Sequence, residues 1–435
     1  MNRTERITAD AKRFIAGGVV SLNRKVDPTI IFERATGSKI VDVEGKEYID
    51  YHAAFAPHLL GHNHPYVNEA VQKSMRSVQS LFGSSTTEWE VTLSQLLMEV
   101  VPSLQRIQIA NNGSEATAHA IRLSRAWTKR DDIILILGGY NGWHNEVSRA
   151  VMPSLDQTGP YVSPGEYPFI ASSAGIPEAT KQKVHIVNFN DLESVEFVMK
   201  RYPVACVLTE PVLQNIGIVL PDREYLQGLI DLCEKYGAVC VFDEVKTGFR
   251  SALGGYQSVA NVKPHLSVFG KALSNGYPLG AIGGRKEIMD LFDDPDPAKR
   301  VLIAGTYNAH PFNTAAAIAT IEFLKRPGVY EHITAMSERL YSGLRTILKA
   351  KGKPFVLSSN ASAYCIYFCE QQPRNLHDIL KHHDFAFDLK LRKALINEGI
   401  YHIPIACKQG SVSYSHSAEN IDRTLDVTEK VLKHL

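Results

Sequence analysis

Two residues that could do chemistry, Lys271 and Asp243, each follow directly on a short apolar run, LSVFG and AVCVF respectively. A lysine between an apolar strand and a glycine-rich loop is partly desolvated, which lowers its pKa and makes its amine a nucleophile able to form an imine. A carboxylate that follows a buried strand needs a cationic partner. That partner is either a nearby basic side chain, Lys246 or Arg250, or the protonated ring nitrogen of a cofactor.

Three other apolar runs are also followed by residues that can bind a ligand. After RIQIA, Gly113 and Ser114 open a helix whose free N–H groups favour a phosphate, although an ordinary N-cap has the same pattern. After IILIL, Tyr140 stands in a glycine-rich loop and can stack on a flat ring or simply pack. After VACVL come Glu210 and Asn215, which a turn at a proline also explains. A phosphate site, a stacking ring, an acid and a lysine together suit pyridoxal 5′-phosphate (PLP).

The apolar runs predict the fold that brings these residues together. Seven runs of four to six residues alternate with helical segments: RIQIA (106–110), IILIL (133–137), VHIV (184–187), VACVL (204–208), AVCVF (238–242), LSVFG (266–270) and LGAIGG (279–284). Such runs indicate strands buried on both faces of a mostly parallel seven-stranded sheet in an α/β fold. Ligands of these sheets collect at the carboxyl ends of the strands.

We expect three regions along the chain. Residues 1–60, with a hairpin in SKIVDVEG and KEYIDY, form an N-terminal segment that joins the small domain. Residues 61–320 form the large PLP-binding domain, and residues 321–435 a smaller α+β domain. The Pro-, Gly- and Ser-rich residues 151–180 are expected to be a lid or an interface loop.

Composition excludes several classes of partner. The 435 residues carry 47 basic and 46 acidic side chains and no long run of one charge, so we expect neither a nucleic-acid nor a membrane partner. The six cysteines form no C-x-x-C pair, and buried free thiols fit a reducing cytoplasm. The N-terminus has no apolar core of a secretory signal. The histidine clusters at 62–64 and 377–383 show no complete ligand set, so no metal site is predicted.

With these residues in view, the chain resembles the class-III (subgroup II) aminotransferases of PLP fold type I, and looks closest to the branch that contains glutamate-1-semialdehyde 2,1-aminomutase. The resemblance runs from about Gly17 to Ile421. Its strongest matches are GSKIVDVEGKEYIDY, LGHNHP, NNGSEATAHAIRLSRA, GGYNGWHN, EPVLQNIG, VFDEVKTGFR, FGKALSNGYPLGAIGG and GTYNAHPFNTAAA. The spacing of VFDEVKTGFR to Lys271 is specific, because a chance match is improbable.

The resemblance implies a role for each matching residue. Lys271 would be the Schiff-base lysine and Asp243 the partner of the pyridinium nitrogen. The other implied contacts are Gly113 and Ser114 with the phosphate, Tyr140 and Val245 on the two faces of the ring, and Asn215 near the phenolic oxygen. Thr306 would reach the phosphate of the neighbouring subunit, which implies a homodimer with a shared site. Arg24 would bind a substrate carboxylate.

Departures from the family pattern bear on the reaction. Asn141 stands where the family usually has histidine, and His310 where it has asparagine. Lys408 stands where the aminomutase keeps a glutamate, and residues 151–180 lack its Gly-Ser-Gly gate; Lys408 either forms a second anionic subsite or is exposed. These differences favour an aminotransferase that moves an amino group from a carboxylate-bearing donor to a keto or aldehyde acceptor. The aminomutase, which gives 5-aminolevulinate, is the alternative, and other PLP chemistry on this scaffold stays open.

Overall fold

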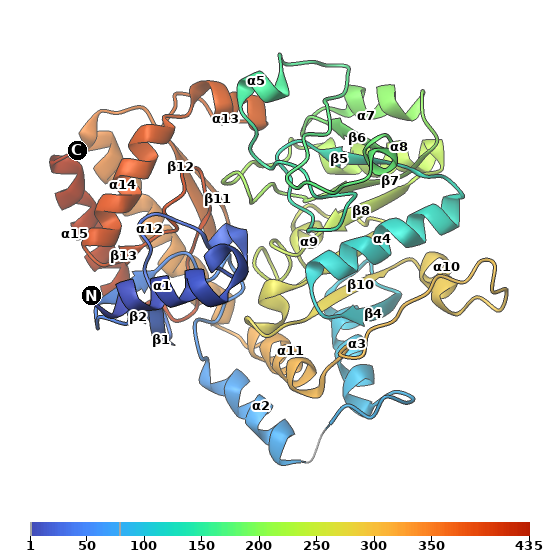
Figure 1. The fold of residues 1–435 in the computed structure, drawn as a ribbon, viewed down its shortest axis with the longest axis horizontal. Coiled ribbons are helices and arrows are strands. Elements are labelled where there is room, and N and C mark those ends of the chain that lie inside the picture. The colour runs from blue at the N-terminus through green and yellow to red at the C-terminus, as the bar shows by residue number, and fades with distance from the viewer. Residues whose placement is uncertain (1, 78–79) are drawn as a thin grey trace.

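A seven-stranded sheet forms the centre of the computed structural model, which describes residues 2–77 and 80–435. The strand order is β4 (Arg106–Ala110), β10 (Gly280–Gly284), β9 (Leu266–Phe269), β8 (Val239–Asp243), β7 (Val204–Thr209), β5 (Asp132–Ile136) and β6 (Val184–Val187) (Figure 1). Strand β10 runs antiparallel to both its neighbours, and the other six strands share one direction. The predicted mostly parallel α/β sheet of seven strands is therefore confirmed.

Helices cover both faces of this sheet, as its fully apolar strands require. The longer helices around the sheet are α2 (Pro65–Arg76), α3 (Glu88–Val100), α4 (Gly113–Thr128), α7 (Leu192–Met199), α8 (Tyr225–Tyr236) and α11 (Pro311–Leu324) (Figure 1). Helix α4 lies against β4 and β7 to β10, whereas α11 packs on α2 and α3. Most side chains of α11 are buried, so this helix is enclosed on several sides and is apolar on more than one face.

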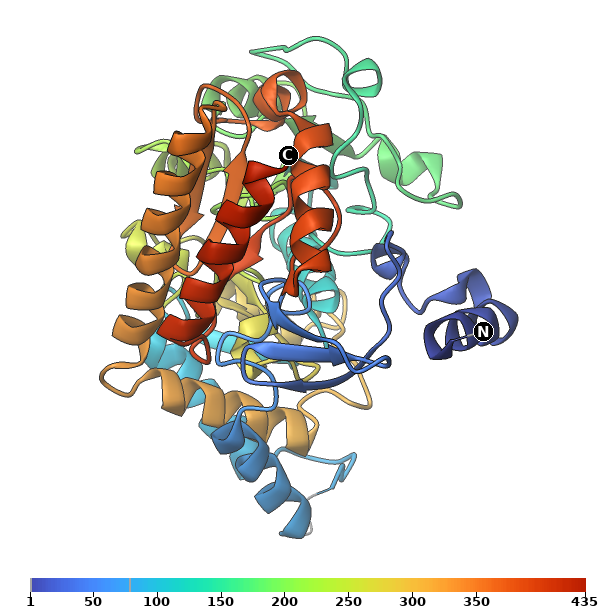
Figure 2. The same cartoon turned by 90° about the vertical axis from the view of Figure 1, so that its left-hand side faces the viewer.

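The remaining strands form two small sheets beside the large one. The first comprises β1 (Phe32–Thr36), β2 (Lys39–Asp42), β3 (Glu47–Asp50) and β13 (Ile400–Tyr401), and the second β11 (Val356–Asn360), β12 (Ala363–Tyr367) and β14 (Gly410–Ser411). Helices α12 (Val329–Lys351), α14 (Phe385–Asn397) and α15 (Ala418–Lys433) pack beside them (Figure 2). Because β13 pairs with β3, strands from opposite ends of the chain share one sheet. The division at residues 60 and 320 stays a prediction.

The other helices are short or peripheral. Helix α1 (Arg3–Phe14) has no buried residue and lies at the edge of the molecule in Figure 2. The rest are α5 (Leu155–Thr158), α6 (Glu178–Lys181), α9 (Tyr256–Val259), α10 (Lys286–Met289), α13 (Leu376–His382) and the 3₁₀ turns η1 (Ala16–Gly18), η2 (Leu22–Arg24), η3 (Lys271–Ser274) and η4 (Asp290–Asp293). Residues 151–180 thus contain two helical turns, and Tyr167 bridges to β6 at Ile186.

Several expectations about class can be compared with the described residues. All six cysteines are buried and unpaired, as predicted. Within residues 2–77 and 80–435 no helix combines the length and the apolar character needed to cross a bilayer. In the same ranges no three His, Cys, Asp or Glu side chains are placed to hold one metal ion.

Candidate active site

Five strands of common direction deliver the predicted site residues to one edge of the large sheet. Gly113 follows β4, Tyr140 follows β5, Glu210 follows β7, Asp243 ends β8, and Lys271 follows β9 by one residue. All five line one hollow of about 460 Å³ at the carboxyl ends of these strands. The strand-end prediction therefore holds for both catalytic candidates.

Lys271 has an uncommon backbone conformation. It opens η3 with φ of 49°, in the left-handed region that non-glycine residues rarely adopt and that often marks a functional site. Among the described residues its Nζ atom has no hydrogen-bond partner. Burial lowers the pKa of Lys271, and the charges of Asp243 and Glu210 oppose that change. The amine is thus accessible from the hollow and easier to deprotonate than an exposed lysine.

Asp243 is 3% exposed, and its partners are amides rather than cations. Its Oδ2 accepts a hydrogen bond from Nδ2 of Asn141 at 2.9 Å, and its Oδ1 accepts one from the backbone N–H of Val245 at 3.0 Å. Burial, followed by the charge of Glu210, raises the pKa of Asp243 to about 7, although both hydrogen bonds and Lys271 act to lower it. Because the pKa of Asp243 is raised, a cation that enters the hollow beside it would favour its ionised form.

Neither of the two basic side chains near Asp243 in sequence, Lys246 and Arg250, forms an ion pair with it. Lys246 donates to the backbone oxygen of Gln214 at 2.8 Å, and Arg250 donates to Ser362 Oγ and to Ala56 O, both at 2.7 Å. The reading that Asp243 merely pairs with a basic side chain is therefore wrong, and the cofactor reading remains.

The start of α4 forms a site for an anionic group. Asn112 caps the helix by accepting from the N–H of Glu115 at 3.0 Å, which leaves the N–H groups of Gly113 and Ser114 without helical acceptors. Space is tight here, because a Cβ atom on Gly113 would lie 2.7 Å from Cγ2 of Val245. The hydroxyl of Ser114 and the positive end of the helix face the same hollow as Lys271.

Glu210 organises the wall on which Tyr140 and Asn215 lie, a role that the sequence did not reveal. Its Oε1 accepts from the N–H of Tyr140 at 2.9 Å and from Nδ2 of Asn215 at 3.0 Å, and its Oε2 accepts from the N–H of Gln214 at 3.1 Å. The position of Glu210 directly after an apolar strand was the available signal. Asn141, noted only as a departure from the family, was likewise not recognised as the partner of Asp243.

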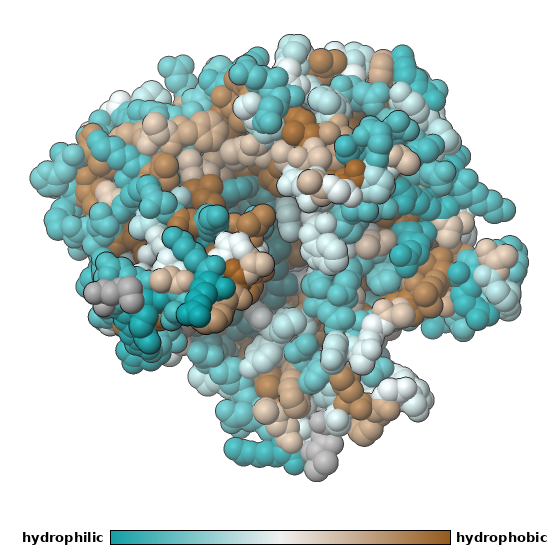
Figure 3. Space-filling model, in the orientation of Figure 1, coloured by the Kyte–Doolittle hydropathy of each residue, from teal (hydrophilic) through white to brown (hydrophobic). Residues whose placement is uncertain are grey.

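A second hollow, of about 380 Å³, adjoins the first. Tyr140, Asn215, Lys246 and Lys271 line both, so the two are continuous. The space-filling view shows the molecule hollowed where the small sheets meet the large one (Figure 3). We call this second space the outer hollow.

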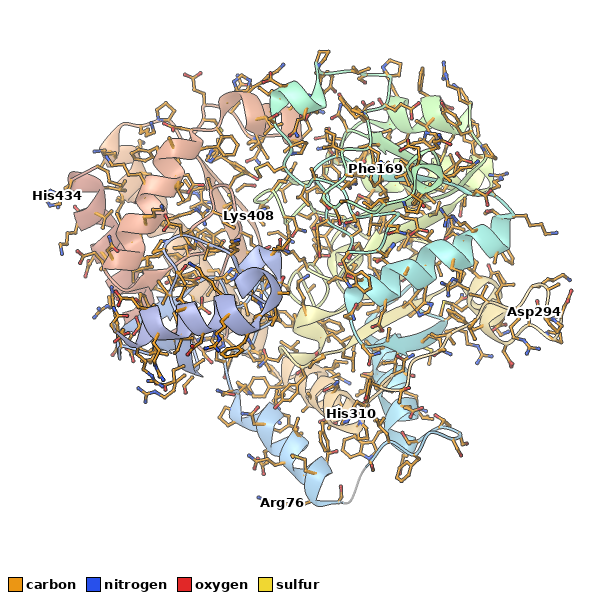
Figure 4. All side chains as sticks on the ribbon, viewed as in Figure 1. Arg76, Phe169, Asp294, His310, Lys408 and His434 are labelled. Atoms are coloured by element: carbon orange, nitrogen blue, oxygen red, sulfur yellow. The ribbon has the colours of Figure 1, made fainter. Side chains whose placement is uncertain are left out.

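Both predicted substrate residues line the outer hollow. Arg24, in η2, is exposed. Lys408 is half-buried and donates to the backbone oxygen of Asn215 at 2.6 Å, so the expectation that it is simply exposed is wrong. Figure 4 labels Lys408 on the side of the C-terminal part that faces the large sheet.

Thr306 does not join the other predicted residues within one chain. It is exposed and lines neither hollow, but its turn lies close by, because Asn308 accepts from Nδ2 of Asn111 at 2.9 Å. The structure therefore gives Thr306 no contact in its own site, and its predicted role in a neighbouring subunit stays a prediction.

The residues present fit PLP on the chemistry of the donors. The inner hollow offers N–H groups and a hydroxyl for a phosphate, a buried carboxyl that lacks a cation, and a lysine without a hydrogen-bond partner. Tyr140 and Val245 line the same space and supply surfaces for a flat ring. These are the groups that the chemistry of this cofactor demands.

Comparison with known proteins agrees with this donor set. The model of the family "Aminotransferase class-III" matches residues 21–381. The chain belongs to the class-III aminotransferases, enzymes of PLP fold type I whose cofactor is PLP.

Individual relatives share nearly the whole chain. A glutamate-1-semialdehyde 2,1-aminomutase of Desulforapulum autotrophicum is 38% identical over 100% of this chain and 99% of its own. An omega-transaminase from Sphaerobacter thermophilus is 28% identical with a TM-score of 0.91, covering 99% of this chain and 97% of that one. A transaminase solved with PLP bound is 26% identical with a TM-score of 0.86, covering 100% of this chain and 98% of that one. The chain is thus similar both to an aminomutase and to transaminases.

Proposed function

We propose that this enzyme transfers an amino group from a carboxylate-bearing amino donor to a separate keto or aldehyde acceptor. The observation that carries the proposal is the continuity of the two hollows: Lys271 lines both, Asp243 lies in the inner one, and Arg24 lies in the outer one. A substrate can therefore reach the lysine while an arginine binds its carboxylate.

Each residue has a defined task in this proposal. When bound, PLP supplies an aldehyde for the amine and a protonated ring that draws electrons from the donor's Cα–H bond. Asp243 would hold the ring nitrogen in its protonated form, and Nζ of Lys271, once released from the cofactor, would take the proton from the donor's Cα. Gly113 and Ser114 hold the phosphate, and Arg24 orients the donor.

Three further side chains of the inner hollow would hold the cofactor ring in the same proposal. Tyr140 and Val245 would pack on the ring, and Asn215 would bind its phenolic oxygen. The hydrogen bonds of Glu210 to the N–H of Tyr140 and to Asn215 support these positions, because they fix the wall of the hollow. A wall fixed before the ligand binds costs less ordering on binding.

We also propose a homodimer in which Thr306 reaches the partner's phosphate site. Exposed apolar side chains support it, since Leu302 is 69% exposed, Tyr307 64% and Trp143 69%. Leu302 and Tyr307 flank Thr306, and Trp143 follows Gly142, which lines the inner hollow. Large apolar side chains gathered near a site mark a surface that a protein chain covers.

Glutamate-1-semialdehyde 2,1-aminomutase is the second candidate, and the name of the relative that is 38% identical favours it. In a mutase the donor and the acceptor are successive forms of one molecule. Lys408, which stands where the aminomutase keeps a glutamate, favours separate substrates.

A half-reaction screen distinguishes the candidates. The holoenzyme is mixed with α-, β- and ω-amino donors, and the absorbance of the lysine-bound cofactor is followed as it converts to the pyridoxamine form. Conversion by a donor whose keto product leaves the enzyme supports the aminotransferase. Turnover of glutamate-1-semialdehyde to 5-aminolevulinate, with no conversion by any other donor, supports the mutase. A Lys271→Ala protein that still retained cofactor covalently after borohydride reduction would contradict the assignment of the lysine.

A further inference from the structure

Lys246 is a buried lysine whose charge no acidic side chain of the described residues pairs with. It is 9% exposed, and its Nζ donates to the backbone oxygen of Gln214 at 2.8 Å. Its second partner, Oε1 of Gln409 at 3.5 Å, is also neutral. An ammonium group enclosed among neutral acceptors is costly for the fold, so a lysine at this position needs a reason.

A second lysine meets Lys246 at the same loop from another part of the chain. Lys408 donates to the backbone oxygen of Asn215 at 2.6 Å, directly beside the oxygen of Gln214 that Lys246 uses. Both lysines and Gln409 line the outer hollow. Each ammonium has three N–H donors, so at least one on each remains for a ligand.

The outer hollow has an unbalanced charge. Its lining includes Arg24 and three lysines but no acidic side chain: Ser21, Asn23, Arg24, His52, Ala54, Phe55, Ala56, Tyr140, Val151, Asn215, Lys246, Lys271, Ile403, Ile405, Lys408, Gln409 and Ser411. Glu210 lies in the inner hollow, where both of its carboxylate oxygens already accept hydrogen bonds. Lys271 is assigned to the cofactor, so the cations of the outer hollow that remain for an anion from outside are Arg24, Lys246 and Lys408.

The titration of the lysines agrees with this geometry. Burial, followed by the charge of Lys271, lowers the pKa of Lys246 well below its usual value, and the charge of Glu210 raises it. Burial likewise lowers the pKa of Lys408. An anion bound between the two amines would favour their charged forms.

We propose that Lys246, together with Lys408, binds a second carboxylate of the substrate, so that the amino donor is a dicarboxylic amino acid. This inference rests on the proposed function, because Arg24 takes the first carboxylate. The outer hollow, at about 380 Å³, is of a size that holds a small diacid. Lys246 would then be a specificity-determining residue: its loss affects diacids and leaves the corresponding monoacids almost unchanged.

Lys246→Met in the holoenzyme tests the proposal, because methionine keeps the unbranched shape of the side chain, one atom shorter, and removes the charge. Glutamate and 2-aminoadipate are compared with norvaline and norleucine in the half-reaction. We expect kcat/KM for the diacids to fall about 10-fold or more, because the second carboxylate loses a charge-assisted hydrogen bond. For the monoacids kcat/KM should change less than about 3-fold. Lys246→Arg should restore part of the preference for diacids.

A binding measurement gives a readout that does not depend on turnover. Glutarate, a diacid without an amino group, is titrated into the holoenzyme by calorimetry, and its Kd should rise about 10-fold or more in Lys246→Met. Lys408→Met is a second variant in case Lys246→Met fails to fold, and it should also raise the Kd of glutarate. Lys235→Met is the matched control, since Lys235 is exposed on α8 and pairs with Glu196, and it should change neither assay.

Three results overturn the inference. The first is that Lys246→Met binds glutarate as tightly as the wild type does. The second is that Lys246→Met loses activity toward diacids and monoacids equally. The third is that glutarate does not bind the wild-type holoenzyme. A holoenzyme that converts no amino donor at all refutes the proposed function instead, and the glutarate titration then still decides whether the anion subsite is present.

Discussion

Replacing Asp243 by asparagine should stabilise the cofactor-free protein at neutral pH. Burial and the charge of Glu210 raise the pKa of Asp243 from 3.8 to about 7. At about 1.36 kcal/mol for each pKa unit, an ionised Asp243 costs the folded state about 4 kcal/mol. Asparagine has the same shape and no charge, and its oxygen can still accept from the N–H of Val245, which lies 3.0 Å from Oδ1. Its amide nitrogen then takes the place of Oδ2, so the side-chain amide of Asn141 must turn to present its oxygen instead of Nδ2.

The effect depends on pH in a defined direction. Because the folded pKa lies above the unfolded one, the carboxyl contributes stability that is fully present below about pH 4 and is lost as the pH rises through about 7. The variant has no such group to ionise. Its advantage over the wild type should therefore grow between about pH 4 and pH 7 and stay constant above.

Thermal unfolding of the cofactor-free proteins between about pH 5.5 and 8.5 measures this difference. For 435 residues, about 1 kcal/mol corresponds to about 1 °C in Tm, so Asp243→Asn should unfold about 4 °C higher at the alkaline end. With saturating PLP the order should reverse, because a neutral amide cannot pair with the protonated ring nitrogen. A variant no more stable than the wild type at pH 8.5, or a difference that does not change with pH, would refute the reasoning.

Asp388→Asn is the matched control of opposite sign. Asp388 is 3% exposed, and its Oδ1 accepts from Nε of Arg392 at 2.7 Å. Burial alone would raise its pKa, but the charge of Arg392 lowers the pKa overall. Stability from this carboxylate is therefore present at neutral pH and is lost as the pH falls through the folded pKa. The control should be destabilised by about 3 kcal/mol at pH 8.5, and less at acid pH.

Two further substitutions probe the phosphate site and the core between the sheets. Gly113→Ala should raise the Kd of PLP about 10-fold or more, because the new Cβ would lie 2.7 Å from Cγ2 of Val245. Titration of the cofactor-free protein with PLP, followed by absorbance, measures this Kd. An unchanged Kd would contradict the tight packing at Gly113. Arg250→Met should lower the free energy of unfolding by about 3 kcal/mol, because Arg250 is 1% exposed and its guanidinium donates to Ser362 and Ala56, which belong to distant segments. Denaturant unfolding measures this, and a loss below about 1 kcal/mol would show that the bonds contribute little.

Much of the site was predictable because its residues are adjacent in sequence to the strands that position them. Asp243 ends β8 and Lys271 follows β9, so apolar runs locate both without knowledge of any contact. The carboxyl ends of strands with one direction meet at one edge, which brings Gly113 and Tyr140 to the same hollow. The antiparallel direction of β10 was not predicted, because an apolar run carries no information on strand direction.

Lys271 shows how far the sequence reaches: its residue type and its place after a strand are local properties, and they predicted its role. Its surroundings were decided by the tertiary structure. The sequence could not tell whether Asp243 pairs with Lys246 or faces a ligand, because that depends on Asn141, which is 102 residues away. Nor could it bring Lys408 beside Lys246, because both lie against one loop only after the small sheets fold onto the large one. Periodicity and turn chemistry are encoded within a few residues, whereas charge balance and burial arise from segments that only the fold brings together.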